Sequence, residues 1–234
     1  MPPEFDRTEI PALLREKQRW IERTSREIEQ QRQLLDPWPH DRIPEKIELR
    51  ALGETWTVEA TEADAAHLRV REEDGLRLHL SGPIGDPEKW RAALKRWLTR
   101  KARQHLSRWV EQEAENHGLH HGSVSIRWQK SRWGSCSRRS RSKLSHPPTG
   151  PTLSLNAGLL FLPPHLMRYV ILHELCHTER MDHSPSFWKK LERIEPQARA
   201  LRDELRSAWR YVPSWLEDAP SRPAREGALR AGCR

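Results

Sequence analysis

The sequence contains few cysteines and no long hydrophobic stretch. Its 234 residues include three cysteines, at positions 136, 176 and 233. So small a number cannot form the disulfide framework of a small secreted domain, and it fits a reducing compartment. The longest apolar runs, 153–162 and 166–175, fall short of the ~20 residues of a membrane-spanning helix. Because the first ten residues also lack the apolar core of a signal peptide, we expect a cytoplasmic protein with no membrane segment.

Acidic residues are missing from one long internal segment. No Asp or Glu occurs between Asn116 and His173. The segment carries eight basic residues, namely Arg127, Lys130, Arg132, Arg138, Arg139, Arg141, Lys143 and Arg168. These eight equal the formal net charge of the whole chain, which is +8. A one-sided basic region favours DNA or another polyanion as a partner through residues 127–143, although a solvated basic loop explains the same composition.

The first part of the sequence predicts a helix followed by strands. Residues 9–35 have the pattern of a polar amphipathic helix, and a Pro-rich stretch at 35–44 ends it. The apolar side of this helix is marked by Leu13, Leu14, Trp20 and Ile21. Polar and apolar residues then alternate, as in antiparallel strands, at 47–51, 55–60, 67–72 and 76–80. Asp74-Gly75 is a strong turn signal between the last two.

The second part predicts mainly helices with two further strands. A helix start is indicated by Asp86 as the N-cap, Pro87 at the first helical position and Glu88 in the first turn. We expect this helix to reach about Asn116. Strands are expected at 123–128 and 152–156. Further helices are expected from Pro163 to about Met181 and from Ser184 onward. The overall order of elements predicts an α+β fold.

The segment His173-Glu174-Leu175-Cys176-His177 carries the strongest chemical signal. It lies at the end of an apolar stretch with the pattern of a helix. Residues four apart on a helix share a face, so His173 and His177 can bind one metal ion. Glu174 lies next to the first ligand, where its carboxylate can accept a proton from water at the metal. The motif also occurs in helices that bind no metal, in which the histidines are merely polar.

A third histidine favours a catalytic metal. Catalytic zinc usually has three protein ligands and one open position. His183 follows His177 by six residues, just beyond the expected helix end, so a turn of the chain can bring its ring to the same ion. A capping or surface histidine is the alternative. Three imidazoles favour zinc over manganese or cobalt, and Cys176 is expected to be a small core residue instead of a ligand.

Three stretches together resemble the YgjP-like metallopeptidase family, which is related to the SprT-like and WLM zinc proteases. They are KSRWGSCS (130–137), LSLNAGLLFLPP (153–164) and YVILHELCHTERMDHSPSFW (169–188). The resemblance covers most of residues 10–210. It implies a minimal zincin-like domain in which His173, His177 and His183 bind zinc and Glu174 is the general base for peptide hydrolysis. Since the SprT-like and WLM relatives act on proteins attached to DNA, it also suggests nucleic-acid-associated targets.

We expect the chain to divide into four parts. They are an N-terminal helix with a Pro-rich linker (1–45), an antiparallel strand region (46–85), the zincin-like catalytic domain (86–212) and a tail (213–234). The tail is rich in Pro, Ala, Arg and Gly and has no periodicity, so it is predicted to be disordered.

Residues around the motif are candidates for substrate contacts. Lys130 and Arg132 could hold an anionic group near the zinc, or belong to a structural turn at Gly134. The LSLN segment (153–156) resembles the zincin edge strand that pairs with an extended substrate. Asn156, at its end, is a candidate for substrate binding, although fixing the corner after the strand is the more expected role. Trp133 and Tyr169 are expected to pack in the core.

Two other functions remain open from the sequence. Lys130, Arg132 and the loop arginines could clamp a phosphate chain, which would make the protein a metal-dependent nucleotide phosphate hydrolase of the pyrophosphatase type. The chain has neither a P-loop nor the carboxylate cluster expected for magnesium. A non-catalytic DNA-binding module with a structural zinc is the third candidate, but such a site has no need of Glu174 and usually has four protein ligands.

Overall fold

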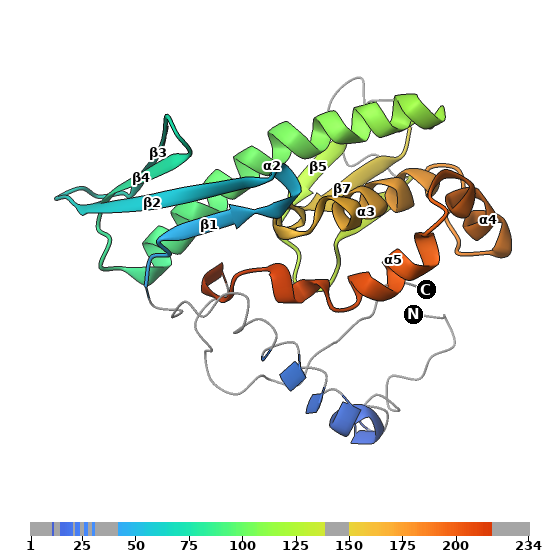
Figure 1. The fold of residues 1–234 in the computed structure, drawn as a ribbon, viewed down its shortest axis with the longest axis horizontal. Coiled ribbons are helices and arrows are strands. Elements are labelled where there is room, and N and C mark those ends of the chain that lie inside the picture. The colour runs from blue at the N-terminus through green and yellow to red at the C-terminus, as the bar shows by residue number, and fades with distance from the viewer. Residues whose placement is uncertain are drawn as a thin grey trace.

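The structure is a computed structural model that describes residues 42–138 and 150–216, together with positions 11, 15–20, 22–23, 26–27 and 30. Two small sheets and a group of C-terminal helices lie along one long helix, α2 (Pro87–His117) (Figure 1). The α+β class expected from the sequence is confirmed. None of the described helices is both long and apolar enough to cross a membrane.

The N-terminal sheet is mixed and not purely antiparallel as predicted. Its strands are β1 (Lys46–Leu49), β2 (Glu54–Glu62), β3 (Arg69–Glu73) and β4 (Arg77–Gly82), in the order β1-β2-β4-β3. The pairs β1–β2 and β3–β4 are antiparallel, but β2 and β4 run parallel. The reason is burial: β4 carries Leu78 and Leu80, both fully buried, and takes the inner position. The charged strand β3 stays at the edge, where such residues are tolerated.

The helix α2 begins and ends at the signals that the sequence contains. The Asp86 carboxylate caps it by accepting from the backbone N–H groups of Glu88 and Lys89 at 3.0 and 3.3 Å. Gly118, with a φ of 61°, provides the left-handed residue that ends it. Trp97 on α2 packs edge-on against Trp56 of β2, so the helix is fixed to the N-terminal sheet. The predicted long helix is confirmed.

The second sheet contains β5 (Val124–Arg127), β6 (Gly134–Ser137) and β7 (Thr152–Asn156), in the order β5-β7-β6. β7 runs parallel to β5 and antiparallel to β6. The expectation that β7 is an edge strand is therefore wrong: its leucines, Leu153 and Leu155, are fully buried and suit the centre. The expected turn at Gly134 is wrong as well, because this residue begins β6.

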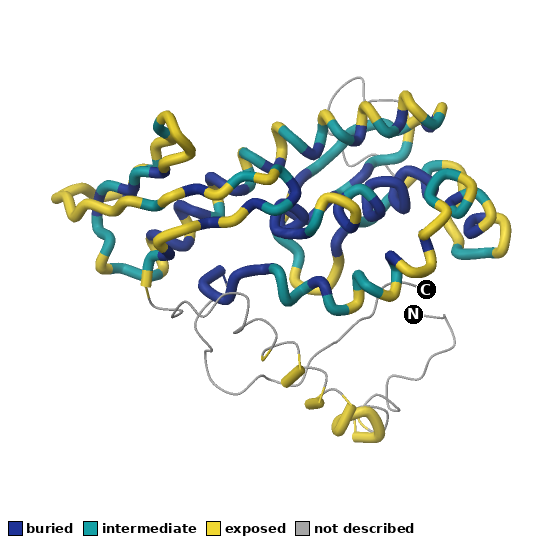
Figure 2. Tube along the Cα trace, in the orientation of Figure 1, coloured by how far each residue is buried: buried dark blue, intermediate teal, exposed yellow. Residues whose placement is uncertain are grey.

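Within the described residues, three α-helices follow the second sheet. They are α3 (Pro164–Cys176), preceded by a 3-10 turn at Ala157–Phe161, α4 (Pro185–Ile194) and α5 (Ala198–Leu205). α3 is buried along nearly its whole length (Figure 2). It ends at Cys176, five residues before the expected Met181, which matters for the site described below.

The chain stays ordered beyond the predicted start of the disordered tail. Residues 213–216 include a 3-10 turn, Ser214–Leu216, and Trp215 is 1% exposed. Its ring lies 6.2 Å from that of Trp90 on α2. The boundary at 213 is therefore wrong, because a buried indole holds this segment on the core. The rest of the predicted tail lies outside the described residues.

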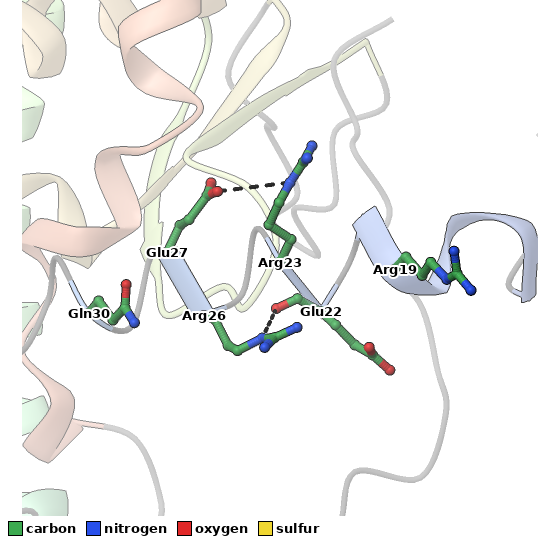
Figure 3. Close-up of a pocket in the computed structure, with 6 residues that line it drawn as sticks. All are labelled: Arg19, Glu22, Arg23, Arg26, Glu27 and Gln30. Atoms are coloured by element: carbon green, nitrogen blue, oxygen red, sulfur yellow. Dashed lines mark hydrogen bonds and ion pairs between the residues drawn. The ribbon is translucent and has the colours of Figure 1, made fainter.

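The expected N-terminal helix is described only in part. Its described positions are helical, but Leu13, Leu14 and Ile21 lie outside the described residues, and Trp20 is 53% exposed. The hollow drawn in Figure 3 is lined by six polar side chains of this segment alone, Arg19, Glu22, Arg23, Arg26, Glu27 and Gln30. Arg23 lies 3.8 Å from Glu27, one helical turn on. These side chains make no catalytic arrangement.

Candidate metal centre

Three histidine side chains converge on one point. The helix α3 places His173 and its C-cap residue His177 one turn apart, and their Nε2 atoms are 3.1 Å apart. The Nε2 atom of His183 lies 3.1 Å from that of His173 and 3.2 Å from that of His177. Two nitrogens around a tetrahedral zinc with bonds of about 2.0–2.1 Å are roughly 3.3 Å apart. The triangle of nitrogens therefore has the size of a metal site.

The early end of α3 brings His183 into the site. The N–H groups of Thr178 and Glu179 donate to carbonyls three residues back, those of Leu175 and Cys176, at 3.0 and 3.2 Å, so the α-helix ends in a turn. A helix continuing to Met181, as expected from the sequence, would carry the chain onward by about 1.5 Å per residue and away from the other two rings. The turn instead returns His183 to the face that carries His173 and His177.

The same turn sets the proton positions of His177. Its Nδ1 lies 2.8 Å from the carbonyl oxygen of Arg180. A carbonyl can only accept, so Nδ1 carries the hydrogen and Nε2 keeps a lone pair directed at the other two histidines. A backbone carbonyl that orients a histidine in this way is typical of metal ligands.

Burial keeps the three rings neutral. It lowers the pKa of His173 to about 3 and that of His183 to about 4, with the neighbouring His177 ring adding to both effects. The pKa of His177 is also lowered, mainly by burial. Neutral imidazoles offer lone pairs, as metal binding requires. The donor set, its spacing and its protonation all fit a divalent ion.

Phe187, at the start of α4, packs against all three rings. It stacks on His177 at 4.5 Å between ring centroids and meets His173 and His183 at 5.1 and 5.0 Å. Its side chain is fully buried. The apolar pattern of α4 indicated only that Phe187 is buried; that it supports the histidines became visible only in three dimensions.

Glu174 lies beside the histidines in an almost dry environment. It is 6% exposed, and burial raises its pKa to about 8, while the charge of Arg132 acts in the opposite direction. Its Oε2 atom is buried and has no hydrogen-bond partner among the described residues. An acceptor left unpaired at such a position suggests that a further group belongs there.

Gly134, the first residue of β6, leaves the space that Glu174 occupies. A Cβ atom at this position would lie 2.6 Å from Oε1 of Glu174 and 2.7 Å from its Cγ. Any larger residue would therefore displace the carboxylate. The sequence motif contains this glycine, but its purpose could not be recognised without knowing that β6 lies against α3.

Asn156 holds the segment between β5 and β6 next to the site. Its side-chain N–H groups donate to the carbonyls of Gln129 and Arg132 at 2.7 and 2.9 Å, and its side-chain oxygen accepts from the N–H of Gly158. The residue is fully buried. The buried amide fixes the corner after β7 and the loop that carries Arg132, which is the role that the sequence favoured over substrate binding.

Comparison with known families agrees with this geometry. The family described as YgjP-like, metallopeptidase domain, matches residues 1–208. The chain belongs to the YgjP-like metallopeptidase family. It is therefore a metal-dependent peptidase, a hydrolase that acts on proteins or peptides.

Two further comparisons concern curated proteins and solved structures. None of the curated proteins matches it. A solved structure that matches in part is the crystal structure of the metallopeptidase zymogen of Pyrococcus abyssi abylysin. It is 24% identical, over 42% of this chain and 90% of that chain, with a TM-score of 0.33.

Of the remaining candidate residues, some are exposed near the site and others are buried in the core. Arg132 is exposed, close enough to Glu174 to influence its pKa, and Lys130 is exposed on the same loop. Trp133 is buried and stacks on Trp209 at 4.1 Å, which is the expected core role. Tyr169 is buried with its ring 5.9 Å from that of His173. Cys176 is fully buried, as expected.

The acid-free segment is only partly available to a partner. Arg168 forms ion pairs with Glu113 at 2.7 Å and Glu195 at 2.8 Å, so its charge is compensated. Four of the other basic residues are exposed, namely Arg127, Lys130, Arg132 and Arg138. The rest, Arg139, Arg141 and Lys143, lie outside the described residues.

Proposed function

We propose that this chain is a zinc-dependent endopeptidase that uses Glu174 as its general base. The convergence of three neutral imidazole nitrogens within 3.2 Å of one another, beside a buried carboxylate, carries this proposal. Three imidazole ligands favour zinc over harder cations. Three protein ligands also leave an open position, which a catalytic site needs and a structural site lacks.

The metal and the protein divide the chemistry between them. Zinc bound by the three histidines would lower the pKa of a coordinated water and polarise the scissile carbonyl. Glu174 accepts the proton of the attacking water and passes it to the amine nitrogen of the leaving group as the peptide bond breaks. A raised pKa suits this role, because the group must be able to both take and give a proton near neutral pH. The buried position of Glu174 also keeps bulk water away from the transferred proton.

The strand β6 is the better candidate for pairing with an extended substrate. Among the described residues it pairs with β7 on one side only, and its first residue lies against Glu174. A peptide added to this edge would gain backbone hydrogen bonds and lie across the metal centre. Arg132, exposed next to Glu174, would then favour acidic groups close to the scissile bond.

The targets are proposed to include nucleic-acid-associated proteins. The support is the acid-free segment, of which Arg127, Lys130, Arg132 and Arg138 are exposed. Arg132 and Lys130 would equally suit a phosphate chain, so hydrolysis of nucleotide phosphates is the competing activity.

Metal content and turnover of matched variants test the proposal. Elemental mass spectrometry of the purified protein should find about one zinc per chain, retained in Glu174→Gln and lost in His177→Ala. Cleavage of denatured casein should be lost in both variants and in chelated wild-type protein. Phosphate release from nucleoside triphosphates is measured in parallel. Full casein cleavage by Glu174→Gln would overturn the role of the base, and phosphate release without casein cleavage would favour the nucleotide hydrolase.

A further inference from the structure

The helix α2 has a strong charge asymmetry that the catalytic chemistry does not use. Between Glu88 and Glu111 it contains no acidic residue, but eight basic ones, Lys89, Arg91, Lys95, Arg96, Arg100, Lys101, Arg103 and Arg108. Its last two turns carry three acids, Glu111, Glu113 and Glu115. A helix that needed only solubility would mix the two signs along its length.

Some of these charges are compensated within the fold and others are not. Lys101 pairs with Glu72 at 3.0 Å, and Lys89 with Asp86 at 3.4 Å. Three exposed arginines, Arg96, Arg100 and Arg103, form no ion pair or hydrogen bond with another described residue. Their spacing of four and three residues places them on one face of the helix. We call these three residues the arginine stripe.

The arginine stripe borders a shallow depression. The depression has a volume of about 340 Å³ and is lined by the stripe together with Lys95, Thr99 and Trp128. Trp128 is half-buried, and its indole N–H donates to the Thr99 hydroxyl at 3.0 Å and to the Lys95 carbonyl at 3.3 Å. These bonds attach the segment after β5 to α2, and the exposed Arg127 and Lys130 flank Trp128 in the sequence.

The same segment leads to the metal centre. Four residues beyond Trp128 is Arg132, whose carbonyl is held by Asn156 and whose charge acts on Glu174. Exposed basic residues therefore occur on α2, on both sides of Trp128 in the sequence and at Arg132, and they define a path from α2 toward Glu174. A ligand extended along this path would need repeated negative charge and no deep pocket.

We propose that the arginine stripe of α2 binds the sugar–phosphate backbone of a nucleic acid. From Arg96 to Arg103 the helix rises by about 10 Å, and a nucleic acid strand in a duplex places one phosphate per ~3.4 Å of axis, so the stripe faces about three phosphates of one strand. The contacts are to phosphates, so the binding is independent of sequence. It is also independent of the proposed zinc chemistry, because none of the three arginines contacts the metal centre.

An anionic membrane surface fits the stripe less well. Helices that lie on membranes present large apolar side chains beside their charges. Within the described part of the chain the exposed large hydrophobic residues are Trp20, Leu76 and Met181, and none lies on α2. The helix buries its apolar face on the protein core instead.

Fluorescence anisotropy with labelled 20-nucleotide DNA, single-stranded and duplex, tests the proposal on the full chain. The variant Arg96→Ala/Arg100→Ala/Arg103→Ala should bind at least about tenfold more weakly at low salt, and its plot of log K against log[salt] should be shallower by about 2 for single strands and about 3 for duplex. The control variant Arg69→Ala/Lys189→Ala/Arg193→Ala removes the same charge from exposed positions on β3 and α4, and should keep the wild-type affinity and slope.

Several outcomes would overturn the proposal. Equal weakening in both triple variants would mean that only net charge matters, and unchanged binding in the stripe variant would place any nucleic acid elsewhere. Binding to vesicles of anionic phospholipid or to polyglutamate that is as tight as binding to DNA, and equally sensitive to the stripe, would assign the surface to those partners. Casein cleavage by the stripe variant should match the wild type. A failed binding test therefore leaves the peptidase proposal standing, and a failed test of peptidase activity leaves the nucleic-acid proposal standing.

Discussion

Gly134 leaves the space that Glu174 occupies beside the candidate metal centre. A Cβ added to Gly134 would lie 2.6 Å from Oε1 of Glu174, well inside van der Waals contact. The backbone of Gly134 cannot retreat easily, because it pairs with Leu155 of the central strand β7. The carboxylate itself is enclosed by protein, with only 6% of the residue exposed. The absence of a side chain at Gly134 therefore allows Glu174, the proposed base, to occupy its position.

The substitution Gly134→Ala should therefore reduce activity while leaving the metal in place. Displacing a catalytic group by about 1 Å can lower the rate about 100-fold, and we expect a fall of this size in kcat/KM for casein-derived peptides. The three histidines are untouched, so zinc content should equal that of the wild type. Gly85→Ala is the matched control, because its added Cβ meets nothing within 4 Å. Wild-type kinetics in Gly134→Ala would show that the carboxylate has more freedom than the structure indicates.

At this scale the sequence indicated the three candidate ligands and the candidate base, but not the residues that support them. His173, Glu174 and His177 are recognisable because helical periodicity alone relates them. Gly134 and Asn156 act on residues that are distant in the chain: Gly134 faces a helix 40 residues later, and Asn156 bonds to Gln129 and Arg132. Such roles depend on which strand lies beside which helix. No local pattern contains that information, so for Asn156 the sequence favoured the corner role without identifying its partners.

Elements with clear local signals were predicted well, and elements defined by tertiary packing were not. Both ends of α2 carry capping residues whose effects act within one turn. The end of α3 carries no such signal: its C-cap is His177, in a helical conformation, and no Gly or Pro lies between His177 and His183 to mark the turn. Likewise, β4 and not β3 pairs with β2, because Leu78 and Leu80 need burial on the core.

The segment from 213 to 216 shows how a short element can depend on one side chain. Trp215 is 1% exposed and packs 6.2 Å from Trp90 at the start of α2. The 3-10 turn that carries it has only three residues, too few to be stable alone. The large apolar area of the buried indole is therefore what holds the segment on the protein.

Replacing this ring should measurably destabilise the whole domain. For Trp215→Ala we expect the free energy of unfolding to fall by about 3–5 kcal/mol, as is typical of a buried aromatic side chain. Urea denaturation followed by circular dichroism measures the change. Trp20→Ala removes an indole that is 53% exposed, so it should alter stability by less than about 0.5 kcal/mol. Equal effects of the two substitutions would contradict the packing of the 213–216 segment.

On the scale of the whole molecule, the proposed metal site joins the end of α3 to the segment that leads into α4. His173 and His177 belong to the end of α3, whereas His183 lies in the turn before α4, and Phe187 at the start of α4 covers all three rings. A bound ion would therefore fasten α4 to α3 in addition to providing chemistry. Binding to the folded state alone stabilises it by mass action.

Removal of the metal should lower thermal stability, and the effect should depend on His183. At a free zinc concentration of about 1,000 times Kd the folded state gains about 4 kcal/mol, and for a domain of this size each kcal/mol shifts the Tm by roughly 2–4 °C. Differential scanning calorimetry should therefore give a Tm about 10 °C lower after chelation than with zinc. His183→Ala should melt at nearly the same temperature in both conditions. The exposed His120 provides the control, since His120→Ala should keep the full zinc-dependent shift. A shift that persists in His183→Ala would mean that the stabilising ion is bound elsewhere in the protein.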